Sequence, residues 1–247
     1  MKKKTQHIIL TIAICVAFVF VVLGAWLIFK SGKQVMNKAN VEWYDENGTE
    51  FVITTADELY GVIQLSEFYD FEGQTIKLGA DIVVNEGNAK DWAKKAPSRK
   101  WFPITGFKGT FDGQGYTISG LYGKSVDTGM GLFCDTQRGA VIRDFRLLNS
   151  YFSGSSEGTG SISGYGGGTF DTIYTDAILK TSYAYAGGII GQISASGEHK
   201  ITNCWFDGDI TMKSEEGIYG GGITGAISGE GGIYRKDHPC QVLILYR

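Results

Sequence analysis

Proline, cysteine and histidine are all scarce in this sequence, with three, four and three copies among 247 residues. Cys15 lies in an apolar run, which leaves Cys134, Cys204 and Cys240 for a folded domain, an odd number with no CxxC pair. This count argues against both a disulfide framework and a zinc site. We therefore expect no metal and no cofactor.

Histidine is too rare to support a common form of catalysis. His199 and His238 are the two copies beyond the N-terminal region, and no serine or cysteine stands at a recognisable nucleophile elbow. A nucleophilic triad is not indicated. We expect both histidines on the surface.

Acidic residues are missing from the first 38 positions, which hold six lysines. The net charge of the whole chain is -3, so the 17 basic and 26 acidic groups beyond residue 38 leave that part at -9. A nucleic-acid partner needs a basic footprint that displaces counterions. The acidic balance therefore disfavours nucleic acid as a partner.

Charge is absent altogether from residues 8–29, a stretch of 22 residues. A helix of this length is about 33 Å long, enough to cross the hydrocarbon core of a lipid bilayer. Lysines flank it on both sides, more densely on the N-terminal side, which favours a cytoplasmic N-terminus. The sequence predicts a single-pass signal-anchor over residues 1–30 and an extracellular domain; a cleaved signal peptide is the alternative.

Two short segments lead from this anchor to the main domain. Residues 31–40 form a polar stalk, and residues 41–53 carry an Asn47-Gly48 turn between apolar residues, which indicates a loose hairpin. Thr55 and Glu58 then have the spacing of a capping box before an apolar face. We expect one capping helix here, at the start of a domain over residues 54–232.

Glycine is abundant, with 36 copies, and it follows no three-residue period of the collagen kind. GGIIG at 187–191 recurs 34 residues later as GGITG, and IRDFRLLN at 142–149 recurs 59 residues later as ITNCWFDG. Such periods indicate a solenoid. The alternation of apolar residues changes phase at Asp144 and Asn203, where an Asx residue can form a corner between two short strands. The sequence therefore predicts an all-β fold, a parallel β-helix (solenoid) whose glycines turn the corners; its right-handed sense is implied by the family resemblance described next.

The chain also resembles a known group, the bacterial cell-surface proteins that carry GLUG-type repeats on right-handed β-helices. The resemblance covers about residues 54–228 and rests on five ordered segments: TADEL at 55–59, FEGQTIKLGADI at 71–82, WFPI at 101–104, GTFDGQGYTISGL at 109–121 and GLF at 131–133. It implies an extracellular module of the kind found in adhesins, without catalytic residues to carry over. Residues 233–247 depart from the pattern and form an atypical tail, which we interpret as a truncated repeat and for which we expect poor order and a tendency to associate.

Motifs that suggest chemistry have simpler interpretations. GGGITG at 220–225 satisfies GxGxxG, but glycines break any helix after it, so no nucleotide is expected. A carboxylate pair for hydrolase or lyase work, or a calcium site at Asp207 and Asp209, stays open as an alternative, with Asp112 and Asp171 also available. Each of these aspartates stands beside a glycine or turn residue, where Asp usually caps backbone.

Two candidate ligand-binding surfaces remain. Cys204 and Phe206 are expected to point inward, so Trp205 points outward, where it either stacks on a sugar or is covered by a loop. The second surface is a basic loop that either is simply solvated or holds an anionic glycan or lipid; its residues are Trp92, Lys94, Lys95, Arg99 and Lys100.

The functional hypothesis is a membrane-anchored extracellular β-helical binding or adhesion module, not an enzyme, with glycan as the favoured ligand class. The alternatives are a polysaccharide-active hydrolase or lyase with a carboxylate pair on one β-helix face, and a structural spacer. The lipid bilayer, through residues 8–29, is the other expected partner.

Overall fold

The structure is a computed structural model that describes residues 39–125, 127–155, 158–182, 185–193, 198–213, 219–227, 231–234 and 242–246, with the backbone alone at 198, 231–234 and 242–246. The predicted membrane span at 8–29 lies outside these residues. Within them, no helix has the length and apolar character needed to cross a membrane.

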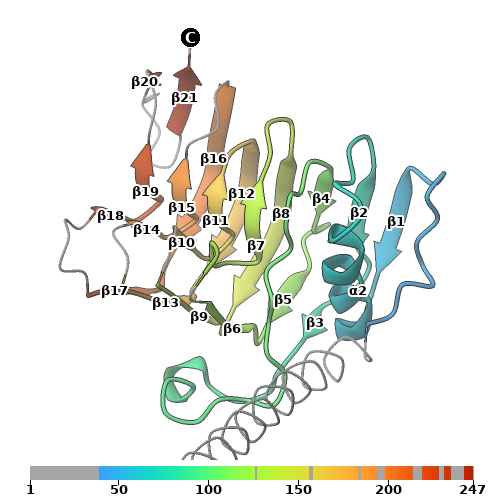
Figure 1. Ribbon diagram of the computed structural model, residues 1–247, viewed down its shortest axis with the longest axis horizontal. Coiled ribbons are helices and arrows are strands. Elements are labelled where there is room, and N and C mark those ends of the chain that lie inside the picture. Colours follow the sequence, from blue (N-terminus) through green and yellow to red (C-terminus); the bar gives the residue numbers. More distant parts are fainter. Residues whose placement is uncertain are drawn as a thin grey trace, which may run out of the picture. The chain divides into compact units, whose positions relative to one another are not determined.

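The chain winds into a β-solenoid with three complete coils, β8–β11, β12–β15 and β16–β19, whose strands pair in parallel with the equivalent strands of the next coil. This confirms the predicted parallel β-helix, while its handedness stays a prediction. Figure 1 shows the long strands side by side along one face. That sheet contains β1 (Glu50–Ile53), β2 (Thr75–Leu78), β3 (Ile82–Val83), β4 (Thr110–Asp112), β5 (Thr117–Ser119), β8 (Val141–Leu148), β12 (Thr169–Thr175) and β16 (Glu198–Phe206).

Three smaller sheets complete the coils. The second sheet contains β6 (Tyr122–Ser125), β9 (Tyr151–Gly154), β13 (Ile178–Thr181) and β17 (Asp209–Met212). The third contains β10 (Thr159–Gly160), β14 (Tyr185–Gly187) and β18 (Tyr219–Gly221). The fourth contains β7 (Phe133–Thr136), β11 (Ser163–Gly166), β15 (Ile190–Ile193) and β19 (Thr224–Ile227).

The core is built from apolar side chains stacked in register from coil to coil. Phe111 is opposite Ile142, which is opposite Phe170, which is opposite Ile201, and none of the four is more than 1% exposed. Burial of one such side chain stabilises the fold by about 1.5–3 kcal/mol. The predicted 59-residue repeat thus spans two coils, because the coil of Phe170 lies between its two copies.

The corner predicted at Asp144 and Asn203 is confirmed, with backbone φ of 58° and 51°. Thr172, at the same place in the intervening coil, has φ 55°. The GG repeats work differently from the prediction that glycines turn corners. Gly188, for example, is not at positive φ, but a Cβ there would clash with the carbonyl oxygen of Gly222 in the next coil, so glycine permits close packing of neighbouring coils.

The predicted helix is α2 (Ala56–Ser66), and its capping box is formed on both sides by Thr55 and Glu58. It lies at the N-terminal end of the domain (Figure 1). Leu59 and Val62 on its apolar face are fully buried. A short 3-10 helix, η1 (Ala89–Asp91), follows in the loop before Trp101.

Three expectations need correction. No hairpin forms over residues 41–53, which contain turns and one strand, β1. This strand pairs in parallel with β2, as the strands of successive coils do throughout the solenoid. His199 is not on the surface but 1% exposed, and its Nδ1 accepts a hydrogen bond of 2.9 Å from the Gly168 amide. His238 lies outside the described residues.

The tail is the third correction, because it joins the first sheet. β21 (Val242–Tyr246) pairs antiparallel with residues 198–201 of β16 and with β20 (Gly231–Tyr234). Pro239 precedes this strand and lies outside the described residues. The last solenoid strand of the first sheet, β16, therefore has a partner along residues 198–201.

Candidate functional site

A groove of about 630 Å³ runs across the outer face of the first sheet, over β8, β12 and β16. Trp205 lies in this groove and is 52% exposed. The neighbouring Cys204 is fully buried, which confirms the predicted alternation. Of the two alternatives for this tryptophan, the exposed ring is the one observed.

Trp205 belongs to a row of side chains that the coil brings into register. It is opposite Tyr174 on β12, which is opposite Arg146 on β8. The Tyr174 hydroxyl donates to Asp207 at 3.1 Å, and the Arg146 guanidinium lies 5.9 Å from the centre of the Tyr174 ring. Neighbouring strands are about 4.8 Å apart, so the row presents a cation and two aromatic rings at regular intervals.

The corner residues lie beside this row in the same groove: Gln114, Asp144, Thr172 and Asn203. All four have positive φ, between 51° and 58°. Asp144, Thr172 and Asn203 stand at the same place in three successive coils, and Gln114 lies in the longer connection between β4 and β5. Together they bring amide, carboxylate and hydroxyl groups to the groove. The groove therefore combines ring faces with hydrogen-bonding groups, as ligand sites commonly do.

A column of three charged residues lies beside the corner residues and starts from Asp112, which lines the groove. Asp112 is opposite Arg143, which is opposite Asp171. The Asp112 carboxylate is 3% exposed, accepts from the Gln114 amide at 3.0 Å and lies 2.7 Å from Arg143 Nη2. Burial acts to raise the pKa of Asp112, but these hydrogen bonds and the Arg143 charge hold it below its ordinary value.

Asp144 has the opposite shift. Burial raises the pKa of its carboxyl, the charges of Asp112 and Asp171 add to the effect, and Arg143 opposes it. Asp171 is itself engaged, because it accepts hydrogen bonds from Thr202 and Asn203. Asp144 also has a protein partner, because its Oδ2 lies 3.7 Å from Arg143 Nε. Of the two carboxylates that line the groove, Asp112 and Asp144, only Asp144 has a raised pKa.

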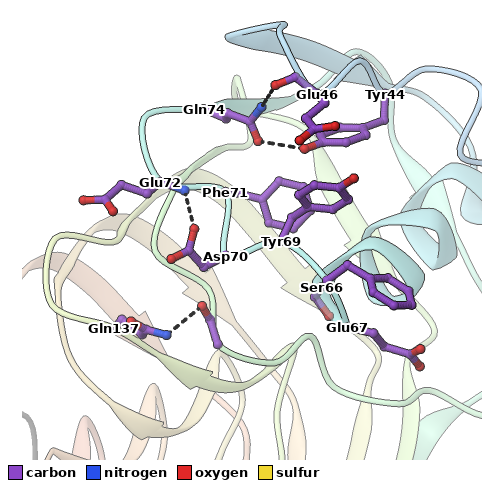
Figure 2. Close-up of a pocket in the computed structure, with 12 residues that line it drawn as sticks. Tyr44, Glu46, Ser66, Glu67, Tyr69, Asp70, Phe71, Glu72, Gln74 and Gln137 are labelled. Carbon is purple, nitrogen blue, oxygen red and sulfur yellow. Dashed lines mark hydrogen bonds between the residues drawn. The ribbon is translucent and has the colours of Figure 1, made fainter.

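A second hollow, of about 570 Å³, lies near the capping helix and is shown in Figure 2. Its polar groups bind one another: Gln74 accepts from the Tyr44 hydroxyl at 3.3 Å and donates to the Glu46 carbonyl, and Asp70 accepts from the Glu72 amide. These contacts hold the first loops of the domain together. We therefore favour the Trp205 groove as the candidate site.

The predicted basic surface is only partly assembled. Lys94 and Lys95 are exposed on the loop. Arg99 is committed elsewhere, since it pairs with Asp57 at 2.5 Å and lies 4.6 Å from the centre of the Tyr60 ring.

The ring of Trp92 is 4% exposed and contacts Tyr122 edge to face, so its placement in a ligand surface is corrected. Lys100 lines a different groove, together with lysines that the sequence had not singled out.

The calcium alternative finds no support in the described part of the chain. The Asp207 carboxylate accepts a hydrogen bond from the Tyr174 hydroxyl. No cluster of three or more histidine, cysteine, aspartate or glutamate residues there is arranged to hold a metal.

Tyr174 and Arg146 belong to the candidate site but were not predicted from the sequence. They could have been found by aligning residues 169–175 with the two copies of the 59-residue repeat. That coil has Thr where the others have Asp and Asn, so its similarity is weak until the backbone is known.

Comparisons with known proteins add one relative. No family model matches the chain, and no solved structure matches it with significance. Halomucin from Haloquadratum walsbyi (strain DSM 16790 / HBSQ001) is 31% identical to it over 156 residues. The match covers 60% of this chain and 2% of that protein, so the chain spans only a small part of the relative's length.

Proposed function

We propose that this chain is a cell-surface β-solenoid that binds carbohydrate through the Trp205 groove and catalyses no reaction. The solenoid and the match to halomucin are compatible with an extracellular structural or adhesion module. The resemblance of five ordered segments to GLUG-type surface proteins supports the same location.

The observation that carries the proposal is the row of Trp205, Tyr174 and Arg146. An aromatic face on a rigid strand is a flat apolar platform for the C–H face of a sugar ring. Because Tyr174 and Arg146 are also held on paired strands, little side-chain entropy is lost when a sugar binds. Asp144 and Asn203, in the same groove, supply acceptors and a donor for sugar hydroxyls. A glycan chain along the coil axis would meet successive side chains of this row.

The test is binding of the purified full chain to a panel of immobilised glycans. Trp205→Ala should reduce retention of the bound glycan by about tenfold or more, in line with the loss of a central aromatic contact. Phe68→Ala is the matched control, because Phe68 is 77% exposed and lines the hollow near the capping helix instead. Equal loss in both variants, or loss in Phe68→Ala alone, would reject the Trp205 groove as the site.

A second candidate function rests on Asp144. A carboxyl with a raised pKa near a carboxylate whose pKa is lowered, here Asp112, is the arrangement that acid–base catalysis uses. Against it, the Asp112 carboxylate is covered by Arg143 and the Asp171 carboxylate is bonded to Thr202, so neither faces a substrate as the second member of a pair. Turnover of a retained glycan, abolished by Asp144→Asn, would favour the enzyme; neither retention nor turnover would favour the spacer.

The membrane anchor at 8–29 belongs to the proposal on the strength of its uncharged length. Protease added to intact cells should remove the solenoid and leave the anchor. Survival of the solenoid until the cells are lysed would contradict the extracellular placement.

A further inference from the structure

A second groove, of about 530 Å³, lies over the sheet formed by β6, β9, β13 and β17. Serine, threonine and glycine make up most of its lining, and no aspartate or glutamate is among its described lining residues. Four lysines complete it: Lys100, Lys124, Lys180 and Lys213. Such an acid-free groove stands out in a domain whose net charge beyond residue 38 is -9.

The coil puts these groups in rows. Lys124 is opposite Ser153, which is opposite Lys180, which is opposite Thr211, on four successive coils. Because neighbouring strands are about 4.8 Å apart, the two lysines of this row are anchored about 10 Å apart. Lys213 lies two positions beyond Thr211, so its side chain leaves the strand region on the same face.

Two of the lysines are positioned by aromatic rings. Lys180 Nζ lies 5.7 Å from the centre of the Tyr151 ring, and Tyr151 stacks on Tyr122 of the preceding coil with ring centres 5.7 Å apart. Lys100 Nζ lies 5.0 Å from the centre of the Phe102 ring. These contacts orient the ammonium groups without neutralising them.

The charge of this groove has no counterpart among the described carboxylates. The ion pairs in the described residues involve Lys77, Arg99, Lys108 and Arg143, and none of the four groove lysines. Like charges brought to one concave surface repel one another and raise the local concentration of anions. A bound anion would relieve that repulsion.

We propose that this lysine groove is a second binding site, which takes the sulfate or carboxylate groups of an acidic polysaccharide. The ammonium groups meet the oxyanions, and the serine and threonine hydroxyls between them meet sugar hydroxyls. Single-stranded nucleic acid fits less well, because the described lining residues include no aromatic side chain that could stack on a base. A bilayer surface fits less well because the lysines line a hollow.

The experiment titrates the purified full chain with dextran sulfate and with polygalacturonate, at several salt concentrations, and with neutral dextran as the backbone control. Lys124→Gln combined with Lys180→Gln should weaken binding of the acidic polymers by about tenfold or more, since two charge-assisted contacts are lost. It should also reduce the slope of log affinity against log salt, because fewer counterions are released. Lys94→Gln combined with Lys95→Gln removes the same charge from the exposed loop and should leave the affinity nearly unchanged.

Equal weakening in the two double variants would show attraction by net charge alone and overturn the site, as would binding of neither acidic polymer. A polynucleotide or a phosphatidylglycerol vesicle that bound more tightly through Lys124 and Lys180 would overturn the polysaccharide assignment. A preference between dextran sulfate and polygalacturonate identifies the oxyanion. Trp205→Ala should leave binding of the acidic polymers intact. The lysine groove and the Trp205 groove are therefore tested by different variants, and either proposal can fail without the other.

Discussion

Arg143 Nη2 lies 2.7 Å from Asp112 Oδ2, and the two residues are directly opposite each other on β8 and β4. The carboxylate is 3% exposed, whereas the guanidinium side chain is 45% exposed. This ion pair therefore joins two neighbouring coils and supplies the partner that a buried carboxylate needs.

Arg143→Met should lower the free energy of unfolding by about 1–3 kcal/mol, because it leaves the Asp112 carboxylate buried without its charged partner. Urea denaturation measures the change. Arg138→Met, at an exposed position outside any described ion pair, should alter stability by no more than about 0.5 kcal/mol. If Arg143→Met changed the free energy of unfolding no more than Arg138→Met does, the structural role of the ion pair would be contradicted.

The same pair predicts a pH dependence. The pKa of Asp112 is lowered in the folded state, so its stabilising contribution is present above the unfolded-state pKa and is lost as pH falls through the folded-state pKa. Denaturation midpoints between neutral and strongly acidic pH should therefore fall less steeply in Arg143→Met than in the unmodified chain.

Asp144→Asn should raise the free energy of unfolding at neutral pH. The pKa of Asp144 is raised by burial and by neighbouring carboxylates, so its ionised form is disfavoured in the folded state. The gain should be about a few tenths of a kcal/mol, because the side chain is 42% exposed and its interactions are screened. It should disappear below the unfolded-state pKa, where Asp144 is neutral in both states; Asp127→Asn, on an exposed residue, is the control.

Thr172→Asn should stabilise the fold by about 1 kcal/mol, because a β-branched residue is strained at φ 55° and Asn tolerates that conformation better. Thr211→Asn makes the same change in a regular strand, β17, where Asn is disfavoured, and should be neutral or destabilising. Thermal denaturation distinguishes the two. Stabilisation by both substitutions would show that the backbone conformation at Thr172 is not the cause.

Deletion of residues 237–247 should lower the melting temperature and increase self-association. The deletion removes β21 and exposes the edge of β16 at residues 198–201, and open strand edges pair with other chains. Thermal denaturation and light scattering measure the two effects. An unchanged melting temperature with less association would restore the expectation of a poorly ordered tail.

The local features of the chain were within reach of its sequence. The capping box of Thr55 and Glu58 depends on residues three apart, and the corners at Asp144 and Asn203 appear as a break in apolar alternation. The outward direction of Trp205 follows from the period of a strand. Each of these depends on near neighbours in the chain, and a single sequence records near neighbours directly.

Which residues meet across coils was decided by the tertiary structure. Trp205 and Tyr174 are 31 positions apart, Lys124 and Lys180 are 56 apart, and β16 and β21 pair in a direction opposite to the rest of the sheet. Coil length varies, with 28 residues from Ile142 to Phe170 and 31 from Phe170 to Ile201, so no fixed period gives the register. The sequence determined that a solenoid forms, because apolar and turn residues recur. The folded coil decided its binding surfaces, because register depends on the length of every loop between two strands.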